Sequence, residues 1–132
     1  MHNLKIATAC FLNQKQELLV VRKKNTSAWM LPGGKLDADE TPARALIREI
    51  REELQLEIAE SSLKPLGIFD AVAANEADTT VHAHAFLVQL PQGCSPCNAA
   101  EIAEMKWLPL NRPLPEDVAP LLKHCIIPAL LN

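Results

Sequence analysis

The spacing of apolar residues along the chain predicts a protein built mainly from strands. Residues 4–12 are mostly apolar and β-compatible, which is typical of a strand buried on both faces. A polar turn at residues 13–16 follows, and residues 17–24 are expected to be the partner strand of a hairpin. A short strand is predicted at residues 29–31, stopped by Pro32-Gly33-Gly34.

The clearest helix signal begins at Thr41 and Pro42. Threonine can cap the free amides of a first turn, and proline fits the first helical position, where its missing N–H costs nothing. Apolar residues follow at helical spacing, so we predict an amphipathic helix ending near Leu54; they are Ala45, Leu46, Ile50 and Leu54.

The second half of the chain predicts three more strands and a terminal helix. Residues 63–73 and 79–90 are expected to be an antiparallel pair, and residues 101–108 a short strand ending at Pro109. The terminal helix is expected to start near Glu116, with Pro120 in its first turn and a break or kink at Pro128. Its apolar face would hold Val118, Leu121, Leu122, Cys125 and Ile126. Strands with two packed helices predict one α+β or three-layer α/β/α domain over residues 1–132.

Composition narrows the functional classes. With 132 residues, 48% hydrophobic and 22% charged, the chain can bury the core of one domain. No apolar run reaches the roughly 20 residues of a membrane span, and the N-terminus has no cleavage-site pattern, so we expect a cytoplasmic protein. The net charge is −3, without a basic stripe, which disfavours binding to duplex nucleic acid.

The cysteines are too few and too scattered for a disulfide scaffold. Cys94 and Cys97 have the spacing of a zinc or redox pair, but no second pair of ligands follows. We expect two plain thiols in a loop.

Acidic residues gather on the first helix. Glu49, Glu52 and Glu53 fall within one face of it, where like charges repel. One interpretation is an ordinary solvated face, with Arg48 paired to Glu52. The other is a site for a divalent cation, since carboxylates on a rigid element are ligands for Mg²⁺. The preceding glycines favour the second, because Gly33 could turn its carbonyl toward the same ion.

This stretch resembles the box motif of the Nudix hydrolase family, of which MutT-like proteins are members. The pattern G-x5-E-x7-R-E-U-x-E-E-x-G-U, with U a bulky aliphatic residue, covers residues 34–56. Gln55 stands where the family has glycine. The matching residues are Gly34, Glu40, Arg48, Glu49, Ile50, Glu52, Glu53 and Leu56.

The resemblance implies a fold, an activity and a set of roles. The implied Nudix fold is a mixed sheet with the box helix and a C-terminal helix packed on it. The implied activity is hydrolysis of a nucleoside diphosphate linked to a further moiety, with Mg²⁺ or Mn²⁺. Glu40 and Arg48 would form a structural ion pair. Many relatives are dimers, so a homodimer is possible. The implied metal ligands are the Gly33 carbonyl, Glu49, Glu52 and Glu53.

Residues outside the box supply further candidates. Glu52 or Glu53 would position or activate the water, and Glu101 or Glu104 could supply a base, or be surface residues. The basic strand end with Arg22, Lys23 and Lys24 could hold a terminal phosphate, or be merely solvated. Trp29 or Phe69 could stack on a base, although either could equally be core. His82 and His84 share a strand face and are expected to be surface residues.

Two classes of function fit these features. The first is a pyrophosphohydrolase acting on a small nucleotide, most readily a nucleoside triphosphate or modified nucleotide, with ADP-ribose or a nucleotide sugar as the alternative substrate. The second is a Nudix-fold module that senses a nucleotide without cutting it. The retained glutamates favour the enzyme, because a sensor has no need of three mutually repelling carboxylates.

Overall fold

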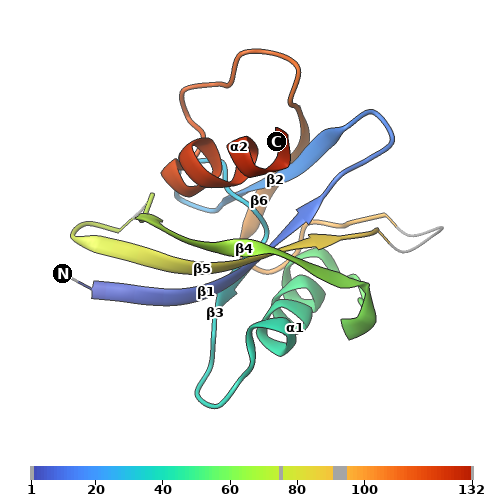
Figure 1. Ribbon diagram of the computed structural model, residues 1–132, viewed down its shortest axis with the longest axis vertical. Coiled ribbons are helices and arrows are strands. Elements are labelled where there is room, and N and C mark those ends of the chain that lie inside the picture. Colours follow the sequence, from blue (N-terminus) through green and yellow to red (C-terminus); the bar gives the residue numbers. More distant parts are fainter. Residues whose placement is uncertain (1, 75, 91–94, 132) are drawn as a thin grey trace.

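The fold is a mixed sheet with helices on both faces, shown in the computed structural model of Figure 1, which describes residues 2–74, 76–90 and 95–131. Four strands form the main sheet in the order β3-β1-β5-β4. They are β1 (His2–Phe11), β3 (Gly33–Lys35), β4 (Leu63–Val72) and β5 (Thr79–Val88). β1 runs parallel to β5, and the other pairs are antiparallel. The expected antiparallel pair of residues 63–73 and 79–90 is therefore confirmed.

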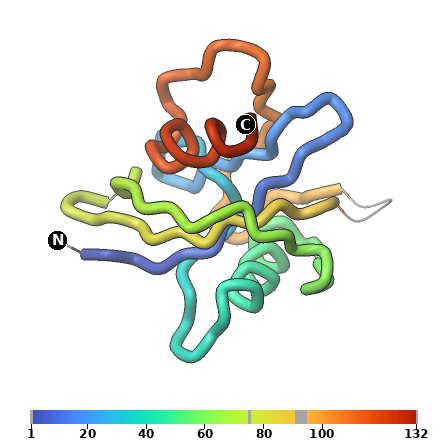
Figure 2. The backbone as a smooth tube through the Cα atoms, viewed as in Figure 1, coloured from blue at the N-terminus to red at the C-terminus, as the bar shows by residue number. Residues whose placement is uncertain are grey.

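Two hydrophobic cores lie on opposite faces of β1. Ala7, Ala9 and Phe11 pack with helix α1 (Pro42–Leu54), whereas Cys10 packs with the C-terminal segment. The two helical segments accordingly lie on opposite sides of the sheet, as the backbone trace shows (Figure 2). This confirms both the layered fold and the expectation that the first strand is buried on both faces. A short 3-10 turn, η1 (Glu60–Ser62), leads from α1 toward β4.

The predicted hairpin of the first two strands is confirmed at its turn, where Asn13 donates its N–H to the Glu17 carbonyl, but it is wrong beyond that point. Strand β2 (Glu17–Lys23) pairs antiparallel with β6 (Ile102–Pro109) in a separate two-stranded sheet, and one isolated bridge, Leu12 to Leu18, joins it to the end of β1. The reason is that β2 is apolar on both faces, with Leu18 in one core and Leu19 in the other. Such a strand carries no polar edge or face that would identify its partner.

The short strand predicted at residues 29–31 is also wrong. Trp29 and Met30 form only isolated bridges, and the strand lies at β3, in the glycines expected to stop it. Gly33 has φ +141°, and a Cβ there would lie 2.1 Å from the Ala7 carbonyl oxygen of β1. Only glycine lets the backbone approach β1 this closely, so here glycine makes the strand pairing possible.

Helix α1 has the predicted boundaries. The Thr41 side chain accepts a hydrogen bond from the Arg44 N–H, and Pro42 occupies the first turn. Beyond the last turn, Gln55 adopts a left-handed conformation (φ 57°, ψ 38°) and donates its N–H to the Arg51 carbonyl. Gln55 thus ends the helix in the left-handed conformation that glycine commonly adopts at this position, at a cost of about 1 kcal/mol in strain.

The C-terminal helix begins at Pro120 rather than near Glu116. Glu116 and Asp117 form a turn instead, and backbone hydrogen bonds of Trp29 with Asp117 and Ala119 hold Val118 in an isolated bridge. A π-helical turn, η2 (Leu122–Ile126), then precedes α2 (Ile127–Leu131). The expected irregularity therefore falls in the turn before Pro128, whose missing N–H removes one helical donor. In the described part of the chain, every helix is too short or too polar to cross a membrane.

Candidate active site

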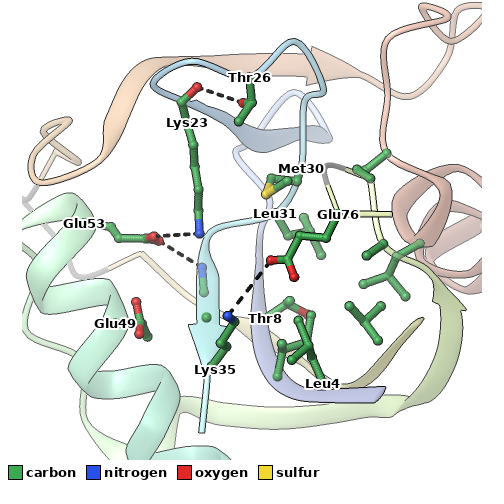
Figure 3. A pocket seen from close by; sticks show the side chains of 18 of the residues that line it. Leu4, Thr8, Lys23, Thr26, Met30, Leu31, Lys35, Glu49, Glu53 and Glu76 are labelled. Atoms are coloured by element: carbon green, nitrogen blue, oxygen red, sulfur yellow. Dashed lines mark hydrogen bonds and ion pairs between the residues drawn. The ribbon is translucent and has the colours of Figure 1, made fainter. Parts of the chain in front are cut away.

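A cavity of about 690 Å³ lies where β1, β3, α1 and the start of the C-terminal helix meet (Figure 3). One end is charged, lined by glutamates of α1 and by Lys23 and Lys35. The other end is aliphatic, with side chains from β1 and from the C-terminal helix. The box residues and the two ends of the chain therefore build one site.

Glu53 is the most buried charged group of this site. It is 5% exposed, and its Oε1 accepts a hydrogen bond of 3.1 Å from the Gly33 N–H. The nearest cation is Lys23, whose Nζ lies 3.9 Å from Oε2. Loss of hydration raises the pKa of the Glu53 carboxyl to about 7. One backbone amide and one lysine at 3.9 Å therefore only partly compensate the negative charge of the Glu53 carboxylate.

Arg48 organises the charged end. Its guanidinium makes a bidentate pair with Glu40, at 2.8 and 2.9 Å, and donates to the Lys35 carbonyl at 3.1 Å. The hydrogen bonds from Arg48 lower the pKa of Glu40 to about 2. Because Glu40 also accepts from the Asp37 N–H, this pair ties the loop before α1 to the helix, as its expected structural role requires.

Glu49 and Glu52 also face Arg48. Arg48 Nη1 lies 3.0 Å from Glu49 Oε1 and 3.6 Å from Glu52 Oε1. A Cβ added at Gly34 would lie 2.5 Å from the Glu49 carboxyl carbon. The second glycine thus leaves the space in which the Glu49 carboxylate rests against β3.

The donor set fits a hard divalent cation. Three carboxylates, whose oxygens are suitable donors, line one end of the cavity, and one of them is buried without a full countercharge. Within residues 2–74, 76–90 and 95–131 no three acidic, histidine or cysteine side chains stand close enough to enclose an ion as they are. Binding would therefore require Glu49 and Glu52 to rotate away from Arg48.

Of the charged candidate residues outside the box that the sequence suggested, some line the cavity and others do not. Glu101 lines the cavity, and its charge contributes to raising the pKa of Glu53. Glu104 does not line it and instead pairs with Arg22, whose guanidinium also donates to the Thr26 carbonyl. Lys24 is exposed and outside the cavity.

The two aromatic candidates also lie outside the cavity. Trp29 is 8% exposed, and Lys106 Nζ lies 4.1 Å from its ring centroid. Phe69 belongs to the core beneath the C-terminal segment and packs over Gly67. The structure therefore places both in packed positions away from the cavity wall.

Sequence reasoning missed part of the cavity. Leu4, Ile6 and Thr8 alternate along β1 and line one wall, and Glu76 lies opposite Lys35 at 4.0 Å. The two-residue period of β1 places these three side chains on one face. Which face borders the site depends on the pairing with β3, which local pattern does not indicate.

Two further expectations concern residues away from the cavity. His82 is partly exposed and lies 2.8 Å from Asp70, which agrees with a surface position. Cys97 is exposed and free, whereas Cys94 lies outside the described residues. The expectation of two plain thiols stays a prediction.

Comparison with known proteins places this geometry in a family. The NUDIX domain profile matches residues 3–127. A Bacillus subtilis protein named "Putative 8-oxo-dGTP diphosphatase" is 30% identical over 115 residues, covering 87% of this chain and 72% of that protein. A Mycobacterium tuberculosis protein named "Putative 8-oxo-dGTP diphosphatase 2" is 35% identical over 100 residues, covering 69% and 68%.

A solved structure agrees over the whole fold. The crystal structure of a MutT NUDIX hydrolase from Burkholderia pseudomallei superposes with a TM-score of 0.77 at 24% identity, covering 99% of this chain and 98% of that one. The box residues, the mixed sheet and the profile match lead to one conclusion: this chain belongs to the Nudix hydrolase family.

Proposed function

We propose that this chain is a pyrophosphohydrolase, dependent on Mg²⁺ or Mn²⁺, that cleaves a nucleoside triphosphate or a modified nucleotide such as 8-oxo-dGTP. The observation that carries the proposal is the buried, undercompensated Glu53 carboxylate beside the Gly33 amide, at the charged end of a nucleotide-sized cavity. The names of two relatives support the choice of substrate.

In this proposal some residues bind the metal ion and others accept the proton of the attacking water. Glu49, Glu52, Glu53 and the Gly33 carbonyl would hold the ion, which supplies countercharge for the diphosphate and makes water more acidic when bound. Water attacks one phosphorus of the diphosphate bridge, and the bond from that phosphorus to the bridging oxygen breaks. A carboxylate must accept the proton of the water; Glu52 or Glu53 is the first candidate, with Glu101 at the same end of the cavity.

Lys23 is the basic residue that we assign to the phosphates. Of the three basic residues at the end of β2, it is the one that lines the cavity, and its ammonium points to Glu53 (Figure 3). Arg22 lies opposite Glu104 in the pairing of β2 with β6 and forms an ion pair with it, and the next side chain along the strand, Lys23, lines the cavity. A phosphate oxygen could replace the long contact to Glu53 with a charge-assisted hydrogen bond.

A substrate screen tests the proposed activity. Purified protein is incubated with Mg²⁺ and with 8-oxo-dGTP, the common nucleoside triphosphates, ADP-ribose and a UDP-sugar, and released pyrophosphate or monophosphate is measured. We expect turnover of at least one triphosphate and its loss in excess chelator. Turnover in chelator would contradict the metal dependence. Tight nucleotide binding without turnover would instead support a sensor.

The Lys23→Met variant tests the assignment of the phosphate contact. Because a charge-assisted hydrogen bond contributes about 1.5–3 kcal/mol, KM for the triphosphate should rise about tenfold or more. The matched comparison is Lys24→Met, which removes an equal charge one residue away, outside the cavity. It should change KM less than about twofold. Equal effects of the two variants would show that only the general charge of the strand end matters.

A further inference from the structure

Thr8 carries an unpaired polar group inside the cavity wall. Its side chain lines the cavity, the residue is 4% exposed, and its hydroxyl has no hydrogen-bond partner. Among the described residues it is the one buried side-chain oxygen or nitrogen left without a partner. Since an unpaired buried hydroxyl costs free energy, its presence in a wall otherwise suited to apolar residues calls for a ligand that would satisfy it.

The position of Thr8 is at the boundary between the two ends of the cavity. It pairs in register with Gly33, whose amide binds Glu53, so it is the first side chain of this wall beyond the charged end. Ile6 and Leu4 follow on the same face of β1, and Leu31, Val81 and Leu122 line the same cavity. Figure 3 shows Thr8 between the carboxylates of α1 and Leu4.

The aliphatic end differs from a stacking site. None of the described residues that line the cavity is aromatic, so a planar ring there would contact aliphatic side chains on both faces. Such contacts favour burial but do not distinguish one ring or sugar from another. Selection must therefore come from a polar group, and Thr8 is the only hydroxyl of this wall of β1.

We propose that Thr8 is a specificity-determining residue, whose hydroxyl bonds to a sugar hydroxyl or ring heteroatom of the nucleoside when the aliphatic end of the cavity holds it. This inference rests on the proposed function, since it takes the phosphates to lie at the carboxylate end. The hydroxyl faces away from open solvent in the structure. A change of χ1 to another staggered rotamer would turn the Thr8 hydroxyl toward the ligand. The hydrogen bond to the ligand would compensate for the energy of that rotamer change.

The test compares Thr8→Val, which removes the hydroxyl at nearly constant shape, with Thr8→Ser, which retains it. For 8-oxo-dGTP and dGTP, we expect Thr8→Val to raise KM about three- to tenfold for the better substrate, the effect of one neutral hydrogen bond. Its kcat should stay within about twofold, and Thr8→Ser should restore KM. The melting temperature of Thr8→Val should equal or exceed that of the wild type, because the unpaired hydroxyl is gone.

Thr79→Val is the matched control. Thr79 is also buried on the main sheet, at 3% exposure, but its hydroxyl donates to the Ala77 carbonyl and it does not line the cavity. This variant should lower the melting temperature and leave KM unchanged. If a threonine hydroxyl binds the ligand, its loss raises KM without lowering the melting temperature. If the hydroxyl is structural, its loss lowers the melting temperature and leaves KM unchanged.

Equilibrium binding separates this inference from the proposed function. The dissociation constant of dGMP is measured by titration calorimetry in excess chelator, where no turnover is needed. Weaker dGMP binding by Thr8→Val, restored in Thr8→Ser, supports the inference even if no triphosphate is hydrolysed. A lack of hydrolysis would count against the proposed function alone. Equal constants in wild type and Thr8→Val, or no binding of dGMP to the wild type, would overturn it. Hydrolysis of geranyl diphosphate in preference to every nucleotide would also overturn it, since that chain offers Thr8 no partner.

Discussion

Replacing Glu53 with glutamine is expected to reduce turnover at least about 100-fold while leaving the fold as stable as before or more so. Glutamine removes one charged oxygen ligand, so it weakens ion binding and the stabilisation of charge in the transition state together. Its amide oxygen can still accept the hydrogen bond from the Gly33 N–H. Because burial penalises the carboxylate, as its raised pKa of about 7 indicates, losing the charge removes an unfavourable contribution to folding.

Steady-state kinetics, the melting temperature and calorimetric titration with Mn²⁺ check this result. Glu57→Gln is the matched control, since Glu57 is an exposed carboxylate just beyond the same helix, paired with Arg51 and outside the cavity. It should leave turnover and Mn²⁺ affinity unchanged. A Glu53→Gln enzyme within tenfold of wild-type turnover would contradict the assignment of Glu53.

Replacing Gly33 with alanine is expected to destabilise the fold by about 3 kcal/mol or more, which lowers the melting temperature by roughly 10 °C. Its φ of +141° is one that L residues rarely adopt, and the new Cβ would lie 2.1 Å from the Ala7 carbonyl oxygen. Relief requires β3 to move away from β1, so both the strand pairing and the Gly33–Glu53 hydrogen bond should weaken.

The neighbouring substitution, Gly34→Ala, provides the contrast. Gly34 has no positive φ, and its Cβ would meet the carboxylate of Glu49, the far end of a flexible side chain. This variant should therefore melt within a few degrees of the wild type but lose about tenfold or more in turnover, because Glu49 is displaced. Thermal unfolding followed by circular dichroism, together with the activity assay, checks both variants. Similar melting temperatures for the two would show that strain at Gly33 is not what limits stability.

The charged end of the site could be predicted from sequence because its information is local. Thr41-Pro42 and the spacing of apolar residues determine where α1 starts and which face is buried, so the positions of Glu49, Glu52 and Glu53 on the helix follow. Their rotation toward Arg48 rather than toward one common point does not follow, because side-chain pairing depends on the folded surroundings.

The rest of the site depends on pairings that local sequence does not contain. β2 is apolar on both faces, so local sequence does not identify β6 as its partner. The ion pair that holds Arg22 to Glu104, away from the cavity, is therefore not predictable either. The wall with Ile6 and Thr8 becomes part of the site only because β3 pairs with β1 and the C-terminal helix covers the same face. The local sequence predicts a strand stop at Gly33, whereas close approach to β1 requires glycine there within a strand.

The pairing of distant strands has a consequence for how the chain acquires its structure. β1 pairs parallel with β5, and β2 pairs with β6, where the ion pair of Arg22 and Glu104 joins residues 82 positions apart. A single bridge, Leu12 to Leu18, joins the first two strands directly, so they gain their main partners only after most of the chain has been synthesised. Loop closure must precede these contacts, which slows folding and leaves two strongly apolar segments exposed on the nascent chain. The active site, which draws on both ends of the sequence, is therefore among the last parts to form.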